Sequence, residues 1–378
     1  MTRKRGNSEG SIVQRSDGRY MARVTLPDGS RRAYYGKTRA EAAQKLQRAL
    51  AAIANGLPLS GDRLAVGSFL EGWLTDHAAQ RVRDKTLRCY RDLVRLHMVP
   101  VIGRISLAKL TPQHVERMMA NVADKGMSPR TVAHCRAVLR NALNHAMRHS
   151  LVSRNVAALA DPPKVPESEI RAITPAAARQ VLLAVKGDRL EALFTVALAC
   201  GLRQSEALGL RWSDVDLETA TLRVQRTLQR VNGEFLVLEP KTKRSRRTIT
   251  LPAPVATSLR QYKARQTEDR LRIGPAWKGD VWDNLVFTDD TGCPLSGFHV
   301  GRRFKSLLAV AGLPEMRYHD LRHGAASLMA AQGVPARVAM EVLGHAQIST
   351  TMNIYAHIAP EFQKDASEKV AAALWPGA

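Results

Sequence analysis

Residues 319–322 read His-Asp-Leu-Arg, residues 343–345 read Leu-Gly-His, and Tyr355 follows ten positions after the second histidine. Helical spacing of three residues places His319 and Arg322 on one face, so both side chains can point at a single site. An isolated arginine on a helix is usually a surface ion pair, and an isolated histidine is usually a packed core residue. The ordered combination therefore carries more weight than any one residue.

Two earlier stretches extend this pattern. Residues 201–208 read Gly-Leu-Arg-Gln-Ser-Glu-Ala-Leu, and residues 240–243 read Pro-Lys-Thr-Lys. Together with the later stretches, which include Asn-Ile-Tyr-Ala-His at 353–357, they resemble the tyrosine recombinases, the phage-type integrases that share a catalytic domain with type IB topoisomerases. Each motif is weak alone, but the set in this order is specific, and the resemblance covers nearly the whole chain.

The chemistry of arginine agrees with this resemblance. Breaking a phosphodiester without a metal requires cations that hold the charge growing on the non-bridging oxygens. Arginine suits this role because its planar guanidinium stays charged and binds two oxygens at once. In the family the first arginine, the H-x-x-R pair and the next histidine gather on the scissile phosphate, which implies this position for Arg203, His319, Arg322 and His345.

Other charged residues are candidates for supporting roles. Lys241 lies in a predicted turn and matches the family's P-K-T position, so the resemblance implies that it protonates the leaving 5′ oxygen as general acid. Lys243 is an alternative for this role, and both lysines could instead simply bind phosphate. Glu206 and Asp320 are predicted either to orient Arg203 and its neighbours or only to offset the positive charge of the site.

Tyr355 is the candidate nucleophile because it alone among the seven tyrosines follows the second histidine, as the family's order requires. A phenol has a pKa of about 10, so cations or a proton acceptor must favour its deprotonation. The phosphotyrosine bond preserves the energy of the broken linkage, so we expect no ATP, no metal and no other cofactor. His345 follows Gly344, where the pattern predicts the start of a helix.

The composition favours a nucleic-acid partner. The 378 residues include 57 Lys and Arg against 34 Asp and Glu, which gives a formal charge of +23 and a pI of about 10.5. Such a surface attracts a polyanion, which releases counterions on binding. Only 5% of residues are aromatic, which argues against successive base stacking on a single strand and favours double-stranded DNA. A ribosome-associated or generally sticky basic protein is the alternative that composition leaves open.

Membrane and metal sites are not expected. The longest apolar run, near residues 193–200, is far shorter than the ~20 residues of a membrane span, and the N-terminus lacks the pattern of a signal peptide. We therefore expect a cytoplasmic protein without membrane contact. The four cysteines lack C-x-x-C spacing and a nearby histidine pair, so we expect reduced thiols, no disulfide framework and no zinc site.

The first sixty residues are predicted to form a small separate domain. Strands are expected at 11–14, 20–24 and 31–35 with Asp-Gly turns between them, followed by a capped helix over 38–56. Twelve Lys and Arg against four Asp and Glu suggest that the sheet face opposite the helix is basic and enters a DNA groove. A solvated basic face is the alternative.

The middle of the chain is predicted to be wholly helical. A polar linker at 57–66 precedes four expected helices, the second of which should end before Pro100. The proline-rich stretch 161–166 suits neither helix nor strand, so it marks a domain boundary.

The last part of the chain is helical apart from one expected three-stranded meander, with strands at 222–228, 235–238 and 247–251. A final helix carries an apolar stripe from Phe362 to Leu374. This stripe either packs on its own domain or, as in the family, docks on a neighbouring subunit.

The predicted architecture is therefore multidomain and mainly α. An arm-type DNA-binding domain with a three-stranded β-sheet and one helix is expected at residues 1–60, a helical-bundle core-binding domain at 65–160, and a mixed α+β tyrosine-recombinase catalytic domain at 170–378. The resemblance implies a site-specific DNA recombinase that integrates or excises a mobile element through a 3′-phosphotyrosyl intermediate. It also implies a homotetramer on double-stranded DNA with core and arm sites, and makes a DNA-bending protein and an excisionase candidate partners.

Two alternatives share this fold. One is a catalytically inactive DNA-binding regulator, and the other is a relaxing enzyme like the type IB topoisomerases. The presence of all six candidate catalytic residues argues against the regulator: Arg203, Lys241, His319, Arg322, His345 and Tyr355.

Overall fold

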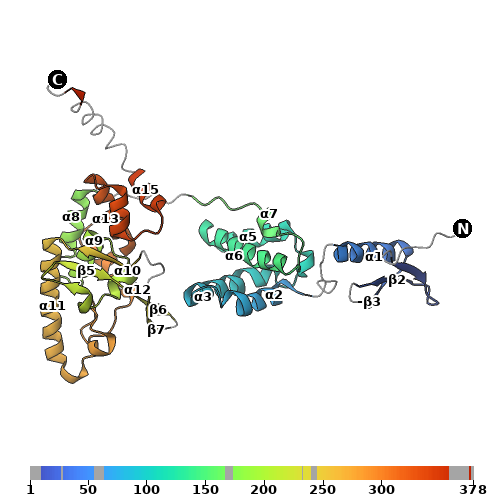
Figure 1. Cartoon of the computed structure of the whole chain (residues 1–378), viewed down its shortest axis with the longest axis horizontal. Helices are drawn as coiled ribbons and strands as arrows, with labels where there is room; N and C mark the ends of the chain where they lie inside the picture. The colour runs from blue at the N-terminus through green and yellow to red at the C-terminus, as the bar shows by residue number, and fades with distance from the viewer. Residues whose placement is uncertain are drawn as a thin grey trace. The chain divides into compact units, whose positions relative to one another are not determined.

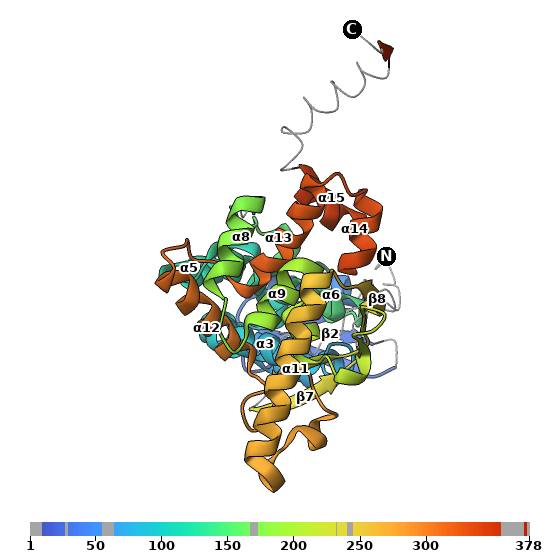
Figure 2. The same ribbon diagram turned by 90° about the vertical axis from the view of Figure 1, so that its left-hand side faces the viewer.

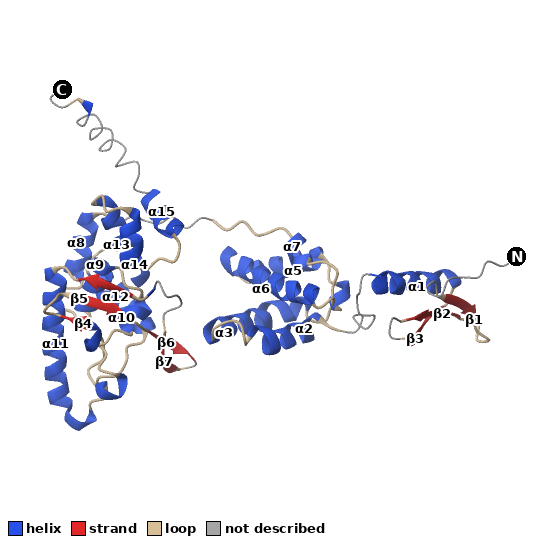
Figure 3. Ribbon diagram, in the orientation of Figure 1, coloured by secondary structure: helices blue, strands red, loops and turns tan. Residues whose placement is uncertain are grey.

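The computed structural model describes residues 10–26, 29–54, 64–166, 173–231, 233–239, 245–356 and 374–375. The chain divides into two compact units, residues 1–167 and residues 168–378. Helices make up most of both units, whereas strands are confined to a small N-terminal sheet and to part of the second unit (Figures 1 and 3). The predicted mainly α, multidomain fold class is confirmed.

The N-terminal sheet has three antiparallel strands in the order β1-β2-β3. Its elements are β1 Ser11–Gln14, β2 Tyr20–Thr25, β3 Arg31–Gly36 and the covering helix α1 Arg39–Ala54. The backbone N–H of Glu41 donates to the hydroxyl of Thr38 at 3.2 Å, so the predicted helix cap is present. Small and aliphatic side chains fill the space between sheet and helix: Ala22, Val24, Ala42, Leu46 and Ala49.

The helical part of the first unit follows the predicted caps. Its segments are α2 Val66–Gly72, the π-helical η1 Trp73–Ala78, α3 Asp84–Leu93, the π-helical η2 Val94–Met98, α4 Val99–Ile102, η3 Leu107–Lys109, α5 Pro112–Asp124, α6 Pro129–Arg148 and α7 Val156–Leu159. The hydroxyls of Thr111 and Ser128 accept the first-turn N–H groups of α5 and α6 at 3.4 and 3.3 Å. The expectation that a helix ends before Pro100 is wrong, because this proline lies in the first turn of α4, where its missing N–H is not needed.

A cluster of buried apolar side chains from Val66 to Ala160 forms the core of this helical part. It shares no residue with the cluster under the N-terminal sheet. The predicted boundary between residues 1–60 and 65–160 therefore remains a proposal that this packing supports.

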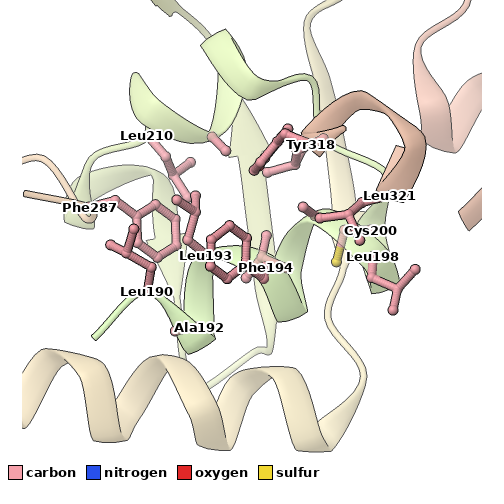
Figure 4. Close-up of a cluster of buried hydrophobic side chains, with 14 of the residues drawn as sticks. Leu190, Ala192, Leu193, Phe194, Leu198, Cys200, Leu210, Phe287, Tyr318 and Leu321 are labelled. Carbon is pink, nitrogen blue, oxygen red and sulfur yellow. The ribbon is translucent and has the colours of Figure 1, made fainter. Parts of the chain in front are cut away.

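The second unit is built around the apolar helix α9 (Figure 2). Its helices are α8 Pro175–Ala184, α9 Glu191–Cys200, α10 Gln204–Leu208, η4 Trp212–Asp214, α11 Ala253–Ile273, η6 Gly274–Ala276, η7 Gly279–Trp282, α12 Gly297–Val310, α13 Tyr318–Ala331, α14 Ala336–Leu343 and α15 Ile348–Ala356. Figure 4 shows Leu193 and Phe194 of α9 at the centre of the core, near Tyr318 of α13. Helices α13, α14 and α15 pack on one another and carry the C-terminal motifs.

The strands of the second unit differ from the predicted meander. They are β4 Val215–Asp216, β5 Thr221–Val224, β6 Thr227–Val231, β7 Glu234–Leu238 and β8 Arg247–Thr250. The expected strand 222–228 is broken, β8 pairs with β5, and β6 pairs only with β7. At the break, Arg226 forms an ion pair with Asp283 at 2.7 Å. Leu222 and Ile249 are partners in register and both buried, so core packing selects the pairing of β5 with β8.

The sequence predictions about cysteines, metal sites and membrane spans can be compared with the described residues. All four cysteines are free, and burial raises the pKa of Cys135 to about 11 and that of Cys200 to about 12. No group of three or more His, Cys, Asp and Glu side chains within the described ranges could hold a metal ion. No helix in the part of the chain that the structure describes is long and apolar enough to cross a membrane. The predicted helix over residues 362–374 lies outside the described residues, apart from Leu374.

Candidate active site

The site begins where α9 ends. Gly201 terminates α9 in the left-handed conformation, with φ of 64°, and Arg203 then occupies the position before α10. The backbone N–H of Arg203 donates to Oε2 of Glu206 at 3.0 Å, and its Nη1 donates to Oε1 at 2.6 Å. Glu206 thus caps the helix and also holds the guanidinium of Arg203, the latter being one of the two roles predicted for it. The side chain of Arg203 keeps 34% of its surface exposed, so it can reach a ligand.

Arg322 lies deeper than Arg203. It is 3% exposed on α13, and its Nη1 and Nη2 donate to the carbonyls of Gly201 and Leu343 at 2.5 and 2.6 Å. Burial, followed by the neighbouring charge of Arg203, lowers the pKa of Arg322 to about 9. Arg322 therefore ties the end of α9 to the end of α14 and remains a cation at neutral pH.

Helix α14 provides the common support for the arginines. The carbonyls of Val342, Leu343 and Gly344 follow one another at its end, and they accept hydrogen bonds from three different arginines: Arg247 at 2.6 Å, Arg322 at 2.6 Å and Arg203 at 2.9 Å. Gly344 has φ of 66° and ends α14. The expectation that a helix starts there is wrong, since a left-handed glycine stops a helix, and α15 begins only at Ile348.

His345 is brought next to this helix end. It is 8% exposed, and its Nδ1 lies 2.8 Å from the hydroxyl of Thr351. Burial, followed by the charges of Arg322 and Arg203, lowers the pKa of His345 to about 3. The imidazole is therefore neutral at pH 7 and can donate one hydrogen bond to a ligand without adding a charge.

His319 lies in the first turn of α13, three residues before Arg322, as predicted. It is exposed, and its ring meets the ring of His323 edge-on at 4.8 Å between centroids. Partial desolvation of the ring comes first in lowering the pKa of His319 to about 4, followed by the positive charges of His323 and Arg322. The imidazole of His319 is therefore neutral at pH 7.

Tyr355 is placed differently from the arginines. It lies half-buried on α15, and its hydroxyl donates to the carbonyl of Val334, in the loop between α13 and α14, at 2.8 Å. Burial raises the pKa of this phenol above its usual value. The structure therefore joins Tyr355 to the same helical group as the other candidates but does not bring its hydroxyl onto the arginine cluster.

Of the predicted supporting residues, Asp320 has a different role and the two lysines stay untested. Asp320 accepts the backbone N–H of Arg317 at 2.7 Å and pairs with its guanidinium at 2.9 Å, so it caps α13 and does not orient Arg203. Lys241 and Lys243 both lie outside the described residues, and the choice between them stays a prediction.

The structure adds Arg247, which the sequence motifs did not identify. This side chain is 7% exposed at the start of β8, and its Nη2 pairs with Oε2 of Glu206 at 2.9 Å. Arg247 lies two residues before the buried Ile249 in a strand, so it occupies an inward-facing position. A charged residue at an inward strand position rarely stays unpaired, and this was the available signal.

Comparison with known proteins places the chain in a family. Residues 164–361, more than half of the 378, match the phage integrase family, and residues 65–121 match its N-terminal SAM-like domain. A protein of Caldanaerobacter subterraneus subsp. tengcongensis named "Tyrosine recombinase XerC-like" is 30% identical over 377 residues, which cover 93% of this chain and 96% of the relative. The cation cluster and this similarity together define an enzyme that recombines DNA at specific sites. The chain belongs to the phage integrase family of tyrosine recombinases.

Solved structures show the same fold. The Tn1549 transposon integrase in complex with transposon right end DNA aligns with a TM-score of 0.70 and 23% identity, over 82% of this chain and 100% of that one. A lambda integrase tetramer bound to a Holliday junction aligns with a TM-score of 0.56 and 18% identity, over 89% of this chain and 95% of that one. At these identities the likeness establishes the fold alone.

The lowered pKa of His345 leads to an expected pH dependence of stability. Between the unfolded pKa of about 6.5 and the folded value of about 3, the unfolded chain binds one more proton than the folded one, so acid favours unfolding. A difference of one bound proton lowers the free energy of unfolding by at most about 1.4 kcal/mol for each pH unit of acidification. Urea titrations at pH 7, 6 and 5 should show that His345→Gln, which cannot take up this proton, loses less stability on acidification than wild type. Equal losses would mean that the pKa of His345 is not lowered.

Proposed function

We propose that this recombinase cuts and rejoins DNA through Tyr355, with the scissile phosphate held by Arg203, Arg322 and His345. The observation that supports this best is the convergence of both arginines on consecutive carbonyls, Gly344 and Leu343, beside His345. Cations fixed in place before the substrate arrives stabilise developing negative charge without a reorganisation cost. His319 lies exposed at the start of the helix that carries Arg322, so it can also reach this phosphate.

The proposed reaction proceeds in two balanced steps. The oxygen of Tyr355 attacks the phosphorus and the bond to the 5′ oxygen breaks. A 3′-phosphotyrosyl bond forms while the tyrosine passes its proton to a neutral imidazole of the site, His319 or His345. The 5′ oxygen leaves as a hydroxyl after taking a proton from Lys241, or from Lys243 if that lysine is the general acid. A 5′ hydroxyl from the other DNA then attacks the phosphotyrosine and passes its proton to the lysine. Tyr355 leaves as a phenol after taking a proton back from the imidazole. No bond energy is lost, so integration and excision are the same chemistry in opposite directions.

Tyr355 must change its hydrogen-bond partner before it attacks. Its hydroxyl donates a hydrogen bond to the carbonyl of Val334. This carbonyl is too weak a base to take up the proton when the phenol ionises. We propose that binding of DNA replaces this bond by one to the phosphate or to a neighbouring imidazole. The attack therefore follows release of the Tyr355 hydroxyl from the loop after α13.

A nicked suicide duplex tests this proposal. Cleavage beside the nick releases a short fragment that diffuses away, so the covalent protein–DNA complex accumulates. Wild-type protein in excess EDTA should form such an adduct, resistant to denaturation and sensitive to protease. Absence of the adduct on cognate core DNA would favour the inactive regulator. Relaxation of supercoiled DNA without strand exchange would favour the topoisomerase-like alternative.

The N-terminal sheet is the proposed reader of arm DNA. Ala22 and Val24 are buried under α1, so the alternate residues of β2 and their partners lie on the open face. Arg23, Arg31 and Tyr35 are exposed on this face, and the guanidinium of Arg15 lies 5.5 Å from the centre of the Tyr35 ring. A cationic face of this kind suits phosphate contacts on both sides of a groove.

We propose that residues 65–160 and the catalytic domain each bind core-site DNA and that four copies assemble on two DNA sites. The match to the SAM-like domain and the tetramer formed by lambda integrase support this arrangement. A DNA-bending protein and an excisionase are proposed from the family resemblance alone.

Deletion of residues 1–60 separates the two DNA-binding functions. The shortened protein should still attack a short core-site suicide duplex, because the catalytic candidates all lie beyond residue 200. It should recombine full attachment sites poorly. Binding to full sites should also depend less on salt, by about 0.9 in the slope of log affinity against log salt for each phosphate that the shortened protein no longer neutralises. Unchanged recombination, or loss of core cleavage, would contradict this division.

A further inference from the structure

Arg247 is a buried cation whose hydrogen bonds reach three separate segments. Nε donates to the carbonyl of Val342 at 2.6 Å, Nη1 to the carbonyl of Ser245 at 3.2 Å, and Nη2 to Oε2 of Glu206 at 2.9 Å. Every nitrogen of the guanidinium therefore has a protein partner, and the side chain is only 7% exposed. With all three nitrogens engaged, this guanidinium is placed to hold these three segments in position.

Glu206 transmits the effect of Arg247 to Arg203. One carboxylate oxygen of Glu206 accepts from Arg247 and the other from Arg203. Burial alone would raise the pKa of Glu206, but the charges and hydrogen bonds of Arg247 and Arg203 lower it below its ordinary value. The carboxylate stays ionised between two cations that would otherwise repel each other, so its position depends on both.

The end of α14 also packs directly on Arg247. A Cβ atom added at Gly344 would lie 2.8 Å from Nη1 and 3.1 Å from Cδ of Arg247. Only a glycine allows this approach, and its φ of 66° independently favours glycine. Arg247 is therefore in contact with the same short backbone segment whose carbonyls hold Arg322 and Arg203.

We propose that Arg247 is a positioning residue for DNA cleavage: it fixes Glu206 and the end of α14 so that Arg203 and Arg322 meet the scissile phosphate together. This inference rests on the proposed function. Without Arg247, the carbonyl of Val342 and one oxygen of Glu206 lose their partner, and the two phosphate-binding arginines lose their common support. A displacement of about 1 Å in such a site can cost on the order of 10²-fold in rate.

The test compares Arg247→Gln with Arg246→Gln in the full-length protein. Arg246 is the adjacent residue, has a side chain that is 55% exposed and pairs with Glu239 on the surface, so its change removes the same charge from a position outside the site. At saturating suicide duplex, Arg247→Gln should form the covalent complex about 10- to 100-fold more slowly than wild type, with core-site affinity changed less than threefold. Arg246→Gln should cleave at the wild-type rate.

A substrate with sulfur in place of the bridging 5′ oxygen separates two ways in which Arg247 could act. Sulfur leaves without a proton donor, so this substrate rescues defects of the general acid. The Arg247→Gln defect should persist, because it concerns the phosphate and not the leaving group. Rescue would instead link the effect of Arg247 to the general acid, Lys241 or Lys243, and would overturn the proposal.

Thermal unfolding decides whether Arg247→Gln is folded enough to interpret. If it is not, Arg247→Lys decides, since lysine keeps the charge beside Glu206 but cannot make three bonds. A cleavage rate of Arg247→Lys below that of wild type, whether the loss is less than tenfold or larger, supports the proposal. A wild-type rate overturns it. Wild-type protein that forms no adduct would refute the proposed function itself, whereas equal rates for wild type and Arg247→Gln would refute only this inference.

Discussion

Tyr355→Phe is expected to abolish covalent attachment to DNA while leaving core-site affinity nearly unchanged. The change removes one hydroxyl group, which in the structure donates a hydrogen bond to the carbonyl of Val334. Loss of the nucleophilic serine in the protease subtilisin costs on the order of 10⁶-fold in rate, and we expect a loss of similar size here, so no adduct should be detectable. Loss of the single hydrogen bond should cost only about 0.5–1.5 kcal/mol of stability, so the variant should fold.

The matched control for this variant is Tyr318→Phe. Tyr318 is 4% exposed in the same unit, and its hydroxyl has no hydrogen-bond partner among the described residues. Its removal should leave cleavage at the wild-type rate. The two variants are compared on the nicked suicide duplex by denaturing gel, and affinity is measured by fluorescence anisotropy. An adduct formed by Tyr355→Phe would show that the nucleophile lies elsewhere.

Arg322→Lys is the second change with a large expected effect. A lysine cannot donate to the carbonyls of Gly201 and Leu343 at once and still present a planar fork to phosphate. Removal of one donor to a developing oxyanion costs about 10²- to 10³-fold in rate, and we expect at least this loss in covalent-complex formation at saturating DNA. The unfolding temperature should also fall, because a buried carbonyl loses its partner.

Arg317→Lys provides the comparison for Arg322→Lys. Arg317 precedes the same helix, and its side chain is 72% exposed and paired with Asp320. The same substitution there keeps the charge and changes a surface ion pair, which contributes little. Its cleavage rate should stay within about twofold of wild type. A rate for Arg322→Lys within tenfold of wild type would remove Arg322 from the phosphate site.

The sequence predicted those parts of the fold that depend on neighbouring residues. The strands around Gly18 and the helices after Thr111 and Ser128 have local signals, a turn glycine and capping hydroxyls, and these elements lie where expected. The pairing of β5 with β8 was not predictable in this way. It joins residues more than twenty positions apart, and the burial of Leu222 and Ile249 in a shared core decides it.

The residues of the candidate site that bind phosphate could be predicted from the sequence, but the contacts that hold them in place could not. The motifs identified Arg203, Arg322 and His345, because order and spacing along the chain carry that information. The part of Arg247 depends on a hydrogen bond to Val342, 95 residues later, for which no local pattern exists. The predicted role of Asp320 in orienting Arg203 is wrong for the converse reason, since a capping contact with the nearby Arg317 satisfies Asp320 locally.

The hydrogen bond from Tyr355 to Val334 has a consequence for the protein when no DNA is bound. A bond of about 1 kcal/mol corresponds to an equilibrium ratio of roughly five to one. In most molecules the phenol is therefore hydrogen-bonded to the loop, and in a minority it is released. A single hydrogen bond therefore favours the inactive position of the Tyr355 hydroxyl without preventing its release. Contact with a phosphate needs to supply little more than one hydrogen bond to reverse the balance, and release of product restores it.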